Sequence, residues 1–430
     1  MAQPQTSLPL RSLARSSSSR STARAEPDTA PDGGPAGWLV VAGCTTFFFV
    51  VLGLIYSFGI VQAELAHRGV ASSATLGWLA SLSVVLSSVF ALPFTALVAR
   101  IGNARSGLVA ALCVGGGYVL LSYALHALPL LFAAQALVGV GYGLMFAACS
   151  SLATQYFVRR RGLAGGIVYA GSGVGGAVLA VGLSRLARAV GLAWAIRIYG
   201  LLALAVLVPA SWLLKHRVPP PLAMVRMSYL RQTNFLLLLA ATATVTFSLF
   251  VPPFFLPTFA VSAGYTAETG AWLVAGYNLA SALGRIMFGF LADSRFGPIS
   301  SLALSMLLMG ASILGIWSVS DSLAALISFL IINGAAAGAL LSLMPIVNAS
   351  LFGVQETVVT MSMLTMSRAI GSGVGSPAAG YLLDAFGGAA SGTRAYRPAL
   401  LLVGSVSLLS AGFVCTLRWR LGGLDLKKRV

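Results

Sequence analysis

Two arginines lie inside apolar stretches of the chain, where a charged side chain is unfavourable unless it serves a purpose. Arg285 stands in GYNLASALGRIMFGFLA, and Arg368 stands in MSMLTMSRAIGSG. An arginine at the centre of a membrane-spanning helix costs about 2.5–3.5 kcal/mol on insertion scales, so it must face a polar cavity and a partner. Its planar, permanently charged guanidinium matches a carboxylate in two-pronged geometry. We therefore predict that Arg285 binds the carboxylate of a small organic anion.

Other interpretations of these polar positions stay open. Arg285 could form a structural ion pair between helices, although no Asp or Glu lies within an apolar stretch to complete it. Arg368 either binds a second carboxylate or extends its long side chain towards the water at the cytoplasmic surface. Four further polar side chains are predicted to line the cavity, with helix packing as the alternative for each: Tyr56, Tyr142, Asn278 and Ser342.

The elements that must position these residues follow from the composition. The 430 residues are 58% hydrophobic and only 9% charged, whereas soluble domains carry about 25% charged residues. About 20 apolar residues span a bilayer as a helix. We predict an all-α membrane protein with twelve transmembrane helices in two six-helix halves. The helices are expected at 38–62, 76–99, 106–126, 129–150, 162–184, 192–214, 234–259, 269–292, 298–319, 323–347, 357–382 and 397–417.

The longest polar interruption, KHRVPPPLAMVRMSYLRQT, falls between the sixth and seventh apolar stretches. Its three consecutive prolines end the preceding helix. A faint repeat also relates the halves, because FTALVARIGNARS at 94–106 and GFLADSRFGPISS at 289–301 each follow the second stretch of a half. We predict a disordered cytoplasmic tail at 1–37, a six-helix half at 38–214, a cytoplasmic linker at 215–233, a second six-helix half at 234–417 and a cytoplasmic tail at 418–430.

The charge distribution predicts the orientation in the membrane. Lys and Arg total 27 against 10 Asp and Glu, and nineteen of the 27 fall on the side that carries both termini. Cytoplasmic segments of membrane proteins are enriched in Lys and Arg. We predict cytoplasmic termini in the plasma membrane, with an organellar membrane as the alternative because the Ser- and Arg-rich tail also resembles a transit peptide. Nucleic-acid binding is not expected, since a lipid-embedded bundle offers no basic face.

Four segments resemble the monocarboxylate-transporter family of the major facilitator superfamily, in a divergent form typical of fungi. The segment at 156–175 is the most specific, because it combines aromatic, basic and small residues in one pattern. The four segments are DGGPAGW at 32–38, YFVRRRGLA at 156–164 followed by AGSGVG at 170–175, Gly284-Arg285 with Gly289 and Asp293, and GSGVGSPAAGYLLD at 371–384.

The resemblance implies a secondary transporter that works by alternating access, with Arg285 at the position of the family's carboxylate ligand. It also implies gating residues at the ends of helices, for which a helix cap, a topology anchor or a solvated loop pair is the alternative. These residues are Asp32, Arg159, Arg160, Arg161, Asp293 and Arg295.

The chain departs from the family where proton coupling is concerned. Ser281 occupies the position of an acid one turn before Arg285, and Ile60 occupies the position expected for a lysine. Whether protons are the coupling ion therefore stays open, and so does the question of an ancillary membrane protein as a partner. The alternatives to a mono- or dicarboxylate substrate are a larger secondary metabolite or vitamin-like solute, exported or imported, and a non-transporting nutrient sensor. No His or carboxylate pair has i, i+4 spacing, so neither an enzyme nor a metal or cofactor site is expected.

Overall fold

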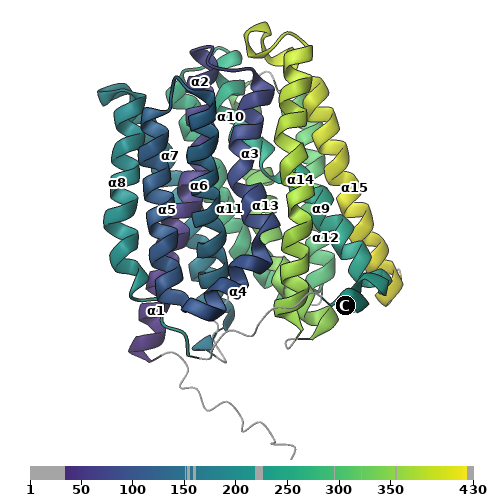
Figure 1. Cartoon of the computed structure of the whole chain (residues 1–430). Helices are drawn as coiled ribbons and strands as arrows, with labels where there is room; N and C mark the ends of the chain where they lie inside the picture. Colours follow the sequence, from purple (N-terminus) through teal and green to yellow (C-terminus); the bar gives the residue numbers. More distant parts are fainter. Residues whose placement is uncertain are drawn as a thin grey trace, which may run out of the picture.

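The computed structural model describes residues 34–150, 152, 155–157, 161–217, 226–294, 296–320, 322–353 and 356–423, except the side chains of 161–163 and 358. This part of the chain is helical throughout, and the helices pack side by side into one bundle (Figure 1). The bundle side on which α1 begins and α15 ends is called the terminal side below, and the other is called the far side. The fold class predicted from composition is confirmed.

The first half contains six helical segments, two of which are composite. The elements are α1 (Pro35–Phe47), the π-helix η1 (Phe48–Leu52), α2 (Gly53–His67), α3 (Ser73–Val89), α4 (Ala91–Ile101), α5 (Asn103–Tyr123), α6 (Leu128–Cys149), α7 (Arg161–Val190) and α8 (Leu192–Ser211). The pair α3 and α4 is bent by 59°. The bend precedes Pro93, which lacks the N–H that an uninterrupted helix would use there.

The second half repeats this arrangement after a short connecting helix. Its elements are η3 (Met227–Arg231), α9 (Thr233–Leu249), α10 (Val251–Ser262), α11 (Ala267–Asp293), α12 (Pro298–Gly315), η4 (Trp317–Val319), α13 (Leu323–Phe352), α14 (Thr357–Ala385), η5 (Ala389–Ser391), η6 (Thr393–Tyr396) and α15 (Arg397–Gly422). Within the described ranges, 10 helices are long and apolar enough to cross a membrane, or 11 with the bent pair. The 29-residue α14 runs beside them.

Some helices extend further than their apolar stretches predict. The fifth predicted segment ends at residue 184, whereas α7 continues to Val190 and carries Arg185 and Arg188 on its last turns. These arginines reach the carboxylate of Glu268 at the start of α11. A hydropathy pattern stops where charges begin, but the helix continues because those charges have partners at the far side.

The two glycines of the sequence repeat have the same local role in each half. Gly102 precedes α5 with φ of 84°, and Gly297 precedes α12 with φ of 80°, a backbone region that favours glycine. The hydroxyl of Ser106 donates to the Gly102 carbonyl at 2.8 Å, and that of Ser301 donates to the Gly297 carbonyl at 2.7 Å. The repeat therefore marks one structural motif used twice.

The halves meet mainly along the helix pairs α2 with α10, α3 with α14, and α7 with α11. The approach is closest at glycines. A Cβ atom on Gly77 of α3 would meet the carbonyl oxygen of Ser376 at 2.7 Å, and one on Gly380 of α14 would meet that of Ser73 at 2.5 Å. Small residues allow such close helix contact inside a membrane. Both contacts lie towards the far side, so the bundle is tightly packed there.

Candidate functional site

A cavity of about 180 Å³ separates the halves towards the terminal side. The first half contributes residues of α3, α4, α6 and α7 to its wall, and the second half contributes residues of α13 and α14. Ser150 after α6 and Thr357 at the start of α14 line it, which places its mouth near the terminal side. A narrower space of about 40 Å³ continues from the same wall towards α9. The sequence offered no way to locate this cavity.

Arg368 of α14 lines both spaces and is the charged residue that they share. Its side chain is half-buried and lies beside the hydroxyl of Tyr142, which is buried in α6. The structure thus places the Arg368 guanidinium at the cavity wall. Tyr142, also predicted to line the cavity, lines it as well.

Aromatic rings line the cavity together with Arg368. Tyr142 and Phe146 meet edge to face with centroids 6.1 Å apart, and Phe48 meets Tyr169 in the same way at 4.9 Å. Phe146 and Tyr169 line both spaces. Aromatic rings bury large apolar areas. The wall therefore suits an apolar body whose charged group reaches Arg368.

Arg285 of α11 occupies a different position, buried against the other half of the protein. Its side chain is 3% exposed. It donates hydrogen bonds to the backbone carbonyl of Tyr169 and, at 2.6 Å, to the hydroxyl of Ser172, both on α7. Its contact with the Ser281 hydroxyl on its own helix is longer, at 3.5 Å. Arg285 therefore links the two halves in this state.

Tyr169 connects the two arginines, and sequence reasoning missed it. Its backbone carbonyl accepts a hydrogen bond from Arg285, and its side chain lines the cavity together with Arg368. Tyr56, predicted to line the cavity, lies beside Arg285 instead. Tyr169 comes directly before the AGSGVG segment, which was the available signal. That motif is defined by its small residues, so the pattern did not single out the tyrosine before them.

The remaining predicted ligands contact other groups. Asn278 donates from Nδ2 to the Val274 carbonyl at 3.0 Å. A Cβ atom on Gly176 would meet Asn278 Cγ at 2.6 Å, so the amide packs between α7 and α11. Ser342 donates to the Ala339 carbonyl of its own helix at 3.1 Å and does not contribute to the lining of the cavity described above.

Most of the predicted gating residues lie outside the described part of the chain. Asp32, Arg159, Arg160 and Arg295 belong to this group, and so does the side chain of Arg161, whose backbone begins α7. Asp293 is exposed at the end of α11.

The far side contains two carboxylates that bridge the halves. Asp384 at the end of α14 accepts hydrogen bonds from the backbone N–H groups of Ser73 at 3.1 Å and Ala74 at 2.9 Å. These amides begin α3, where a helix N-terminus favours a negative charge. Glu268 of α11 accepts from Arg188 of α7 at 2.8 Å. Asp384 belongs to a motif found by sequence, whereas no sequence pattern indicated Glu268.

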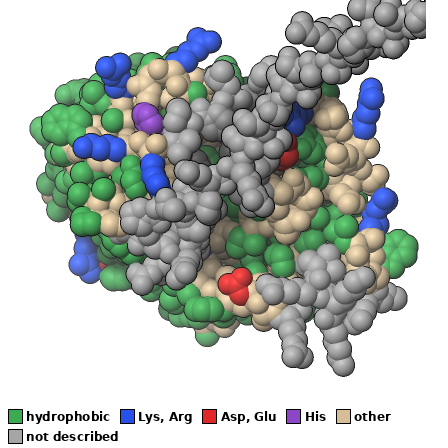
Figure 2. Space-filling model, turned by 90° about the horizontal axis from the view of Figure 1, so that it is seen from below, with side chains coloured by type: hydrophobic (Ala, Val, Ile, Leu, Met, Phe, Trp, Pro, Cys, Tyr) green, Lys and Arg blue, Asp and Glu red, His purple; other side chains and the backbone are tan. Residues whose placement is uncertain are grey.

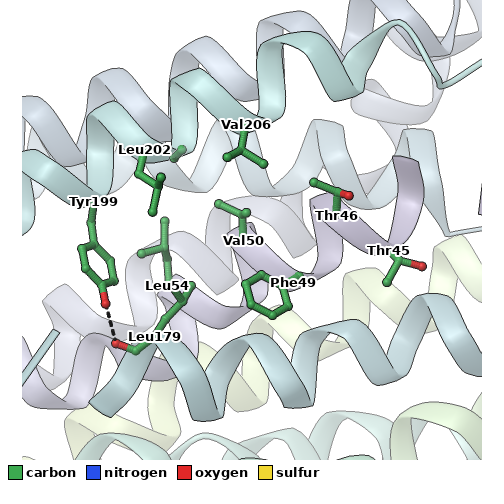
Figure 3. Close-up of a pocket in the computed structure, with 10 residues that line it drawn as sticks. Thr45, Thr46, Phe49, Val50, Leu54, Leu179, Tyr199, Leu202 and Val206 are labelled. Atoms are coloured by element: carbon green, nitrogen blue, oxygen red, sulfur yellow. Dashed lines mark hydrogen bonds between the residues drawn. The ribbon is translucent and has the colours of Figure 1, made fainter. Parts of the chain in front are cut away.

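A separate groove of about 230 Å³ lies on the flank of the first half, between the first span, α7 and α8 (Figure 3). Phe49, Val50, Leu54 and Leu202 give it an apolar wall. The Tyr199 hydroxyl donates to the Leu179 carbonyl at 3.0 Å at one end of the groove (Figure 3). Its lining shares no residue with the central cavity.

Two packed helical halves with a cavity between them on one side and close contact on the other form the arrangement of a membrane transporter. The chain belongs to the Major Facilitator Superfamily, whose sequence profile matches residues 35–271 and 236–428. It is an integral membrane protein and a secondary transporter of that superfamily, which is not a family of enzymes.

Relatives agree with the predicted resemblance. The MFS transporter asaE of Aspergillus flavus is 29% identical over 91% of this chain and 90% of its own length. The aspyridones efflux protein apdF of Emericella nidulans is 27% identical over 90% of this chain and 80% of its own length. Monocarboxylate transporter 13 of Bos taurus is 27% identical over 92% and 91%. The predicted likeness to monocarboxylate transporters and to fungal members is confirmed.

The fold also matches a solved structure. A bacterial homologue of the human lysosomal transporter Spinster, in an inward-facing and occupied conformation, superposes with a TM-score of 0.70 at 18% identity. The match covers 90% of this chain and 97% of that one.

Proposed function

We propose that this transporter exports an apolar organic anion, such as an acidic secondary metabolite, from the cytoplasm across the plasma membrane. The observation that carries the proposal is the position of Arg368, a cation on the wall of an aromatic cavity between the halves. A ligand site of this kind holds the body of a molecule by apolar contact and orients it with a few polar groups.

The lining favours a larger substrate over a small monocarboxylate. Phe146, Tyr169 and Met361 border both spaces, and Leu340 and Met344 extend the narrower one. Methionine side chains adapt to irregular apolar shapes. A carboxylate of two or three carbons would leave most of this surface without contact. The aspyridones efflux protein among the relatives supports export as the direction of transport.

The basic residues support the proposed orientation. Seen from below, Lys and Arg side chains gather around the edge of the terminal side (Figure 2). Arg100 lies in the last turn of α4 and Arg420 in the last turn of α15, both on this side. Because Lys and Arg are enriched in cytoplasmic segments, we place the terminal side, and therefore the mouth of the cavity, in the cytoplasm.

A matched pair of probes tests the proposal. 2-Naphthalenesulfonate is aromatic and permanently ionised, and 2-naphthalenesulfonamide has the same ring without the charge. We expect the purified protein to bind the sulfonate at least about tenfold more tightly than the sulfonamide, because hydrogen bonds to charged groups contribute about 1.5–3 kcal/mol. Isothermal titration calorimetry measures both Kd values.

Variants separate the cavity arginine from general charge. Arg368→Gln should weaken sulfonate binding by about tenfold or more and leave sulfonamide binding unchanged. Arg394→Gln, an exposed arginine on the far side, is the control and should bind like the native protein. Equal binding of both probes, or full sulfonate binding by Arg368→Gln, would contradict the proposal.

A small carboxylate is the second candidate, favoured by the compact polar cluster around Arg285, Ser172 and Tyr56. Methanesulfonate distinguishes it, since this anion has the charge and geometry of the probe without the ring. We expect methanesulfonate to bind at least tenfold more weakly than 2-naphthalenesulfonate. Equal affinities would favour the small substrate.

A further inference from the structure

Arg368 stands where the halves must meet when the transporter changes state. Its half-buried side chain faces a cavity whose walls belong to different halves, namely α3, α4 and α6 on one side and α13 and α14 on the other. In the present state, the cavity leaves room for water beside the guanidinium. Alternating access requires these walls to close, and closure removes that water. The charge of Arg368 then needs another partner, because a buried charge is unfavourable unless it is paired.

Four of the five carboxylates of the described chain are engaged elsewhere, and the fifth is exposed. Glu64 pairs with Arg68, Glu268 with Arg188, and Glu356 with Arg226, each at 2.7 to 2.8 Å. Asp384 binds the first amides of α3, and Asp293 is exposed at the end of α11. The group beside Arg368 is instead the neutral hydroxyl of Tyr142.

The buried charge of Arg285 makes an anion in the closed cavity still more favourable. The guanidinium donates to the backbone carbonyl of Tyr169, whose side chain lines the cavity together with Arg368. Arg285 is buried in the present state and has α7 as its hydrogen-bonding partner. Closure of an empty cavity would therefore desolvate Arg368 in the neighbourhood of a cation that is already buried, whereas a bound anion compensates the positive charge.

We propose that this transporter is an anion exchanger, in which the cavity closes readily around a bound anion and slowly when it is empty. Export of one organic anion is then coupled to the return of another anion from the opposite side. This inference rests on the proposed binding of an organic anion at Arg368. It concerns the step after binding, so binding without exchange would contradict it and leave the proposed function intact.

Release from proteoliposomes tests exchange directly. Vesicles that contain the full-length protein are loaded with 2-naphthalenesulfonate, which is fluorescent and does not cross lipid as an ion. They are diluted into either benzenesulfonate or gluconate, with potassium and valinomycin holding the membrane potential at zero. We expect release to be at least about tenfold faster into benzenesulfonate. Equal rates in the two media would overturn the proposal.

Substitutions at the cavity arginine identify the cause. Arg368→Lys retains the charge and should retain a faster release into benzenesulfonate. Arg368→Gln removes the charge, so at saturating internal probe the ratio of the two rates should fall below about twofold. A ratio in Arg368→Gln equal to that of the native protein would show that another group imposes the exchange. The native ratio decides the proposal by itself if the Gln variant releases no probe, and Arg394→Gln serves as the unaffected control.

Discussion

The far and terminal sides of the bundle bring the same two halves together in opposite ways. On the far side, Gly77 and Gly380 allow backbone contact, and Asp384 joins α14 to the first turn of α3. On the terminal side, the bend between α3 and α4 and the rings of Tyr142 and Phe146 hold the halves apart around Arg368. Small residues and a carboxylate that accepts from backbone N–H groups thus form a contact that can be broken. Bulky residues and the Arg368 charge surround a space that a ligand can fill.

The largest expected effect comes from the glycine contact. A Cβ atom on Gly380 would meet the Ser73 carbonyl oxygen at 2.5 Å and Ala74 Cα at 2.7 Å. Both are backbone atoms, so Gly380→Val should separate α3 from α14 and destabilise the closed far side by about 1–3 kcal/mol or more. Double electron–electron resonance between spin labels on cysteines that replace the exposed Trp78 and Tyr381 should report a longer distance.

A control for this change is available on α15. A Cβ atom on Gly412 has no neighbour within 4 Å, so Gly412→Val should leave the distance between the labels unchanged. An unaltered distance in Gly380→Val would show that the far side does not depend on the glycine contact.

A smaller effect is expected when the carboxylate at the start of α3 is removed. Asp384→Ala takes away the acceptor of two N–H groups, and loss of a helix cap costs about 0.5–2 kcal/mol. The same pair of labels should show a larger open population on the far side. Ser328→Ala removes an exposed hydroxyl of α13 that bonds within its own helix and should have no effect. If both variants behave like the native protein, Asp384 does not hold the halves together.

A weaker effect still is expected from the exposed ion pair between Glu268 and Arg188. Glu268→Gln should shift the far-side population by only about 0.2–1 kcal/mol, because exposed ion pairs are screened by water. The shift should diminish further in 1 M salt. An effect as large as that of Asp384→Ala, or one that persists in high salt, would mean that this pair is the principal closure.

The smallest expected effect is that of a pH gradient on transport. Ser281 and Ile60 stand where a proton-coupled relative would carry an acid and a base, and Ser281 contacts Arg285 rather than a carboxylate. Exchange of 2-naphthalenesulfonate should therefore proceed at the same rate with or without an imposed pH gradient. Accumulation of the probe that follows the gradient and disappears with a protonophore would establish proton coupling.

Much of the fold could be predicted from the sequence, because the signals are local. Apolar stretches predicted the helices, and Gly102 and Gly297 marked the same turn in both halves. The bend after α3 was missed although Pro93 signals it, since a hydropathy pattern treats the stretch as continuous. The ends of α7 and α13 were placed too early because the hydropathy pattern stops at a polar residue, Arg185 or Asn348.

The site was less accessible to prediction. Both arginines could be identified as unusual from their apolar surroundings. Which of them faces the cavity depends on how α11 and α14 are rotated against α7 and α6, and packing between distant segments sets that rotation. Carboxylate binding was therefore predicted mainly for Arg285, where it stays a prediction. The structure places Arg368 at the cavity wall. Tyr169 was missed because its importance comes from two neighbours remote in the sequence.

The central claim is that an anion at Arg368 allows the terminal side to close. Spin labels that replace the exposed residues Arg100 of α4 and Ser350 of α13 report the width of the cavity mouth. In gluconate, the native protein should show the long distance, and 2-naphthalenesulfonate should shift the population to a shorter one. Arg368→Gln should populate the shorter distance without the probe. If the probe leaves the native distances unchanged while it binds, and Arg368→Gln matches the native protein, the account is contradicted.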